Sequence, residues 1–149
     1  MLKKLASLSF LILLMGCENT PTHPIELLTL KEVQNQINLS ETQKILFTLA
    51  SDNMMGRDSQ SGGYFKAAEF VTDYFQAKNI TPFYPAYQDT LSTKGVKTYN
   101  VVGQIGTYDP QKKTILIGAH LDHVGIRGSE GDTIYNGAND NATGLCKKS

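Results

Sequence analysis

A histidine and two aspartates near the end of the chain have the residue types and the spacing of a metal site. His120, Asp122 and His123 follow an apolar run at residues 114–119, and Asp140 comes twenty residues after His120, in a turn flanked by glycines. Imidazole nitrogens and carboxylate oxygens are common zinc ligands. The pattern therefore predicts a metal site in which an imidazole at the end of a strand meets a carboxylate on a rigid turn.

The residues ahead of this site have the patterns of helices. Apolar side chains at helical spacing predict a helix from about 25 to 38 and a longer one over 63–78, which Asn79 would cap at its C-terminus. A further helix is predicted to begin between them at Ser40, which forms a capping box with Gln43. Along the sequence, the predicted helices therefore come before the predicted strands.

The predicted strands follow in the second half. We expect an edge strand over 84–91, a strand over 99–105, a turn at 108–111 and a fully buried strand over 114–119. Helices ahead of buried strands predict a three-layer α/β domain. Ligands in such sheets bind at the carboxyl ends of strands, which is where His120 would lie.

Composition narrows the class of protein. The chain has 149 residues, of which 40% are hydrophobic and 19% are charged, so it is not of a disordered type and suggests one domain or part of one. The formal net charge is zero, and no basic stripe predicts nucleic-acid binding. Arg57, in a polar connection, is expected to be a solvated charge, with an ion pair to Asp52 or Asp58 as the alternative.

The N-terminus resembles a bacterial lipoprotein signal peptide. Lys3 and Lys4 precede an uncharged stretch over 5–15 that is too short to span a membrane, and the stretch ends in the sequence LMGC. We expect a signal peptide at 1–16, lipidation of Cys17, a linker at 17–24 and the folded domain from 25 onward. The protein would then be anchored to a membrane of the bacterial cell envelope, in the periplasm or at the cell surface. An ordinary secretory leader is the alternative.

Several motifs together resemble one family. IGAHLDH at 117–123 and NGANDNATG at 136–144, with LASDNMMGR at 49–57 and NVVG at 100–103 upstream, are similar in order and content to the motifs of di-zinc aminopeptidases. That family includes aminopeptidase Y-like, bacterial leucyl aminopeptidase-like and glutaminyl cyclase-like enzymes. The resemblance covers about residues 40–144 and implies a three-layer αβα zinc-exopeptidase fold with a mixed central sheet.

The resemblance implies a role for each residue of the site. His120 would bind one zinc, Asp140 would bridge two zincs, and Asp122 would accept a hydrogen bond from the His120 imidazole and fix its tautomer. A helix-like segment should begin just after Asn141. The two zincs would polarise a water that attacks the N-terminal peptide bond of a peptide substrate. His123 is interpreted as a loop histidine at the mouth of the site.

The sequence departs from the family pattern after Asp140. No Asp, Glu or His follows that residue, so the proton-accepting Glu and the remaining ligands have no counterpart. We therefore expect a fold truncated after roughly its first half: an inactive N-terminal portion of a zinc metallopeptidase. The alternatives are a glutaminyl cyclase-like acyltransferase, whose relatives bind a single zinc, and a non-catalytic surface lipoprotein that binds peptides.

Overall fold

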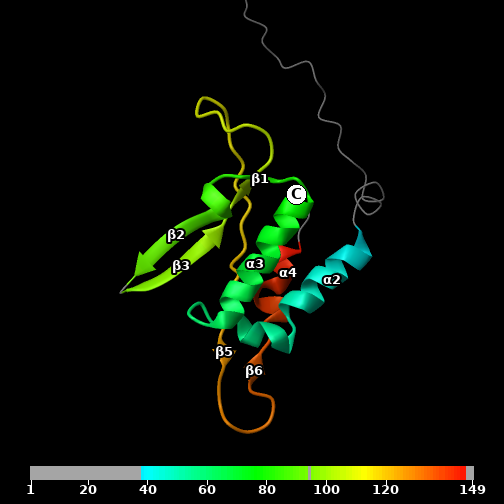
Figure 1. Cartoon of the computed structure of the whole chain (residues 1–149). Coiled ribbons are helices and arrows are strands. Elements are labelled where there is room, and N and C mark those ends of the chain that lie inside the picture. Colours follow the sequence, from blue (N-terminus) through cyan, green and yellow to red (C-terminus); the bar gives the residue numbers. More distant parts are fainter. Residues whose placement is uncertain (1–37, 94, 147–149) are drawn as a thin grey trace, which may run out of the picture.

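The structure is a computed structural model that describes residues 38–93 and 95–146 (Figure 1). The predicted signal peptide at 1–16, the lipidation site Cys17 and the linker at 17–24 lie outside the described residues. So does the first predicted helix, except for its last position, Asn38. These four remain predictions.

The first described helix is α2 (Leu39–Leu49), and its cap differs from the predicted one. The chain enters the helix at Asn38, whose side-chain oxygen accepts a hydrogen bond from the Glu41 N–H at 3.1 Å. Asn and Ser serve equally well as N-caps, so the earlier residue takes the role. The predicted capping box at Ser40 is therefore wrong, because Ser40 already lies inside the first turn.

The long helix α3 (Gly62–Ala77) confirms the clearest helical pattern of the sequence. The Ser61 side chain caps its start by accepting from the Tyr64 N–H. At its end Asn79 adopts a left-handed conformation with φ 55° and donates its N–H to the Gln76 carbonyl at 3.0 Å. The next N–H, from Ile80, bonds to Phe75, which completes a Schellman motif.

A short 3-10 segment, η1 (Asp52–Arg57), joins the two helices and packs closely against α3. Gly63 makes this approach possible, since a Cβ atom there would lie 2.0 Å from the carbonyl oxygen of Met54. Arg57, the last residue of η1, is buried in this region.

Within residues 38–93 and 95–146, the strands form three separate antiparallel pairs. The longest pair joins β2 (Gln88–Thr93) to β3 (Val96–Val101), with Gln88 opposite Val101. The other two pairs are short: β1 (Thr81–Pro82) with β4 (Gly103–Gln104), and β5 (Gly125–Ile126) with β6 (Ile134–Tyr135).

Two of the predicted strands have different bounds in the structure. The edge strand begins at Gln88 rather than at Tyr84, because Pro85 opens a 3-10 turn, η2 (Pro85–Tyr87). The strand predicted over 99–105 is divided between β3 and β4. The break lies at Val102, whose N–H bonds to the Tyr87 carbonyl at 2.8 Å. The turn predicted at 108–111 is confirmed, with the Lys112 N–H bonded to the Asp109 carbonyl at 3.0 Å.

The apolar run at 114–119 is not the buried strand that the sequence predicts. It is extended chain outside any sheet, and the side chains of Ile115 and Leu116 are 86% and 89% exposed. A strand buried on both faces needs neighbours along both edges, and within the described residues no strand pairs with this run. Helices with small antiparallel sheets are compatible with an α/β class, while the three-layer architecture stays a prediction.

The core lies where α2, α3 and the C-terminal helix α4 (Thr143–Leu145) meet, with α4 against α2 (Figure 1). Its buried members are Leu49, Met54, Ala67 and Ala142, and Leu121 packs against them. Leu121 follows His120 directly, and Ala142 comes two residues after Asp140. The same core therefore anchors both segments that carry the predicted metal ligands.

Candidate metal centre

The side chains of His120 and Asp140 lie next to each other. The Nε2 atom of His120 is 3.0 Å from Oδ1 of Asp140, and each side chain is more than half exposed. The two residues come from different segments, one after the extended apolar run and one from the π-helical segment η3 (Ala138–Ala142). The structure thus brings together the two residues that the sequence predicts as metal ligands, at the surface of the protein.

The other nitrogen of His120 faces its neighbour Asp122. Nδ1 is 2.9 Å from the backbone carbonyl oxygen of Asp122 and 3.5 Å from its carboxylate Oδ1. A neutral imidazole that donates its proton from Nδ1 keeps a lone pair on Nε2, the atom that faces Asp140. The nearer acceptor is the backbone carbonyl of Asp122 and not its carboxylate. In this geometry Asp122 therefore orients the His120 ring mainly through its backbone.

His123 lies closer to the site than its interpretation as a loop residue suggested. Its Nδ1 atom is 3.8 Å from Oδ2 of Asp140, and its side chain is only 13% exposed. Both oxygens of the Asp140 carboxylate therefore have an imidazole neighbour. The sequence signal that could have indicated this is the position of His123, three residues after His120.

A glycine fixes the turn that carries Asp140. Gly137 has φ 62°, in the left-handed region, and its carbonyl accepts a hydrogen bond from the Ala142 N–H at 3.2 Å. The peptide bond between Asp140 and Asn141 is cis. The helix α4 begins at Thr143, which confirms the prediction that a helix-like segment starts just after Asn141.

Arg57 is the site residue that the sequence did not reveal. It is fully buried, so the prediction of a solvated charge is wrong, and the alternative pairing with Asp52 or Asp58 does not form either. The guanidinium donates instead to four backbone carbonyls: those of Leu49, Leu121, Asn136 and Gly137. Those acceptors belong to segments distant in sequence, and the residues adjacent to Arg57 gave no sign of them.

The charge of Arg57 is balanced by the carboxylates of the site. Burial lowers the pKa of the guanidinium, and the negative charges of Asp122 and Asp140 oppose that shift. An arginine keeps its proton in proteins even when its pKa falls. A fixed positive charge therefore lies near the two carboxylates.

The geometry fits two ligands of one zinc ion. Zinc bonds to histidine nitrogen and carboxylate oxygen are about 2.0–2.2 Å long, so two ligands of the same ion lie about 3–3.5 Å apart. The 3.0 Å between His120 and Asp140 meets that condition. Within the described residues, however, no group of three or more His, Cys, Asp or Glu side chains is arranged to hold a metal, so the fit is partial.

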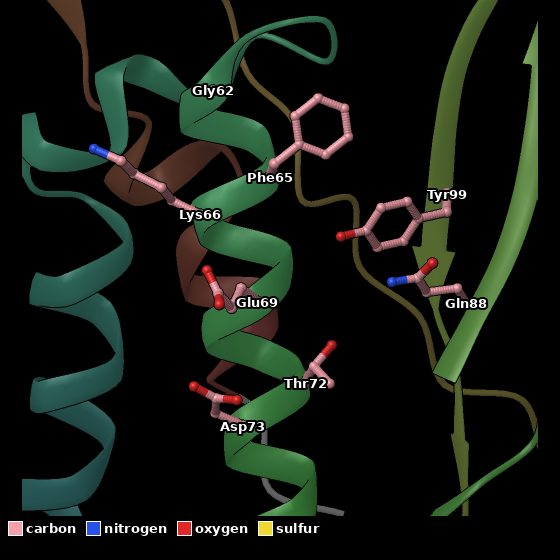
Figure 2. A pocket seen from close by; sticks show the side chains of 8 residues that line it. All are labelled: Gly62, Phe65, Lys66, Glu69, Thr72, Asp73, Gln88 and Tyr99. Atoms are coloured by element: carbon pink, nitrogen blue, oxygen red, sulfur yellow. The ribbon is translucent and has the colours of Figure 1, made fainter. Parts of the chain in front are cut away.

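A separate groove lies between α3 and the β2–β3 hairpin and does not include the predicted ligands. Its volume is about 450 Å³. Figure 2 shows Phe65 on the helix, with the Tyr99 hydroxyl directed toward that helix, and the two rings are 6.1 Å apart. The lining residues are Gly62, Phe65, Lys66, Glu69, Thr72, Asp73, Gln88 and Tyr99. None of them is a residue to which the sequence gives a chemical role.

No helix in the described part of the chain has both the length and the apolar character needed to cross a membrane.

Comparisons with known proteins give one match, which covers part of the chain. No curated protein and no solved structure matches the chain. One family model does match, over residues 100–146, and this region contains His120, Asp122, His123 and Asp140 but not Arg57. The matching model is that of peptidase family M28, so in this region the chain is similar to a family of zinc peptidases.

Proposed function

We propose that this chain carries part of the metal site of a zinc-dependent aminopeptidase, with His120 and Asp140 as ligands and Asp122 as the residue that orients His120. The observation that carries the proposal is the 3.0 Å contact between the two side chains. They are distant in sequence, and both lie in the region that matches a peptidase family. The substrate class is a peptide with a free N-terminus.

The residues of the chain would contribute to this chemistry in distinct ways. His120 offers the Nε2 lone pair, because its Nδ1 atom is directed toward Asp122. Asp140 offers one oxygen beside His120 and a second one beside His123, which suits a carboxylate that bridges two ions. The zinc, when bound, would polarise the attacking water.

Catalysis needs more ligands than this pair supplies. A catalytic zinc has about three protein ligands, and the described residues form no group of three. We propose that the described residues supply two ligands of the zinc site in a three-layer αβα exopeptidase fold and do not by themselves complete a catalytic zinc site.

A calorimetric zinc titration of the purified full chain tests the ligand assignment. We expect the parent to take up zinc and the His120→Ala and Asp140→Ala variants to lose that uptake, since each removes one of the two matched ligands. His23→Ala, which changes a histidine in the linker predicted at 17–24, is the matched control and should bind as the parent does. Absence of zinc uptake by the parent, with no change on His120→Ala, would instead favour a non-catalytic lipoprotein that binds peptides.

The same preparations should release little or no amino acid from an aminoacyl anilide, with or without added zinc. Zinc-dependent release by the parent, abolished by His120→Ala, would show that the chain is a complete enzyme. Zinc-dependent cyclisation of an N-terminal glutamine would instead indicate the glutaminyl cyclase-like acyltransferase.

We further propose that Cys17 carries a lipid anchor that holds the protein at a membrane of the bacterial cell envelope. The support is the LMGC sequence after a short apolar stretch. Expression in bacteria with an alkyne-tagged fatty acid should label the parent and not Cys17→Ser, while Cys146→Ser should be labelled as the parent is. Equal labelling of the Cys17→Ser chain would exclude this anchor.

A further inference from the structure

We propose that Arg57 is the positioning residue of the metal site: its guanidinium holds the segment with His120 and His123 in register with the turn that carries Asp140. The inference rests on the proposed function where it assigns a metal to the site. The positioning itself concerns contacts within this chain. Arg57 lies outside the region that matches the peptidase family.

Two contacts join Arg57 to the histidine segment. Its Nε atom donates to the Leu121 carbonyl at 2.8 Å, and its own carbonyl accepts from the His123 N–H at 3.0 Å. These bonds fix the backbone on both sides of Asp122. His120 directly precedes Leu121 and His123 carries the second of these bonds, so the positions of both imidazoles depend on this backbone.

Two further contacts join the same guanidinium to the turn. Nη1 donates to the Asn136 carbonyl at 2.7 Å and Nη2 to the Gly137 carbonyl at 2.9 Å. Gly137 is also the residue whose carbonyl accepts from Ala142, across the turn that carries Asp140. One planar group therefore binds both segments, and its fixed fork sets their separation.

The chain before His120 provides no comparable support. Residues 113–118 are exposed, and in the described structure they make no backbone hydrogen bond to another element. His120 is therefore held from its C-terminal side, by the Arg57 bonds and by the packing of Leu121 on the core. A lysine at position 57 would keep the positive charge but lose the planar guanidinium. The Arg57→Lys variant therefore distinguishes the effect of the charge from the effect of the hydrogen-bond geometry.

A metal-free proximity measurement tests the positioning. His120 and Asp140 are replaced by cysteine in a full chain with Cys17→Ser and Cys146→Ser, and the two thiols are joined by an alkylating reagent that fluoresces only after reacting with both. We expect the rate of cross-linking to fall severalfold when Arg57→Lys is added. Arg127→Lys, which alters an exposed guanidinium that pairs with Asp58, is the matched control and should leave the rate unchanged.

A second variant tests the same contacts with the guanidinium retained. A methyl group at Gly137 would lie 2.6 Å from Nη2 of Arg57, whereas one at Gly131 would meet nothing within 4 Å. Cross-linking should therefore fall with Gly137→Ala and not with Gly131→Ala. A folded Arg57→Lys or Gly137→Ala chain that cross-links at the parent rate would overturn the proposal. Loss of the native circular dichroism signal by both would also overturn it, because the contacts would then support the whole fold.

Zinc titration separates this inference from the proposed function. Loss of a group that orients metal ligands typically costs about 10–100-fold in metal affinity, and we expect a loss of that size for Arg57→Lys in the chain that retains His120 and Asp140. If the parent binds no zinc but cross-linking still depends on Arg57, the proposed function fails and the positioning stands. If the parent binds zinc and Arg57→Lys binds it equally well, the positioning fails.

Discussion

Replacing Arg57 by methionine is expected to lower the free energy of unfolding by about 3–5 kcal/mol, because several backbone carbonyls lose their charged donor at about 1–3 kcal/mol for each one left buried. The guanidinium is fully buried and donates to four carbonyls. Methionine fills part of the volume but donates nothing, and a buried acceptor left without a donor costs about 1–3 kcal/mol. The carboxylates of Asp122 and Asp140 would also lose the nearby positive charge.

Urea unfolding followed by far-ultraviolet circular dichroism measures this loss, since the chain has no tryptophan to report it by fluorescence. Arg127→Met is the matched control. Its guanidinium pairs with Asp58 at 3.1 Å on the surface, with the arginine side chain 58% exposed. Exposed pairs of this kind contribute about 0–1 kcal/mol. Equal losses in the two variants would contradict the assignment of Arg57 as a buried bridge.

The partners of Arg57 explain why the sequence did not predict its role. Asp52 and Asp58 are close in sequence, so a surface ion pair was the natural alternative to a solvated charge. The acceptors that the guanidinium contacts are backbone carbonyls, and the most distant, Gly137, is 80 residues away. Every residue has a backbone carbonyl, so the sequence does not indicate which carbonyl will accept a hydrogen bond from Arg57. Its use as a partner becomes visible only when the chain is folded.

Local signals, by contrast, predicted the helix α3 and its ends well. Asn79 caps the end of the helix as predicted, and Ser61, for which no cap was predicted, caps its start; each acts through a residue three positions away. The same reasoning placed the cap of α2 two residues late, because Asn38 and Ser40 are equally good caps and nothing nearby distinguishes them. Local chemistry thus predicts that a helix forms more reliably than it predicts where the helix begins.

The apolar run at 114–119 shows where prediction from local sequence fails. Its composition is that of a buried strand, but a strand exists only through partners that other segments supply. In the described structure Ile115 and Leu116 are exposed instead. The pairing of His120 with Asp140 was nevertheless predicted correctly as a juxtaposition, because it depends on the core beneath Leu121 and Ala142 and not on a sheet. That these residues bind zinc stays a prediction.

Gly137→Ala is expected to destabilise the fold through both backbone strain and crowding at the site. The residue has φ 62°, and a left-handed conformation costs a residue with a Cβ atom about 1–2 kcal/mol. The new Cβ atom would also lie 2.6 Å from Nη2 of Arg57, from the carbonyl oxygen of Asp140 and from Cδ2 of His123. Overpacking of this kind adds about 1–3 kcal/mol.

Gly131→Ala isolates the first of these two costs. Gly131 has a similar φ of 71° in the loop between β5 and β6, and a Cβ atom there meets nothing within 4 Å. The difference between the two variants in the free energy of unfolding therefore measures the crowding at Gly137 alone. Two equal values would mean that the guanidinium and the imidazole move aside freely. The site would then deform easily, and His120 and Asp140, which lie 3.0 Å apart, would not be a preformed pair of ligands.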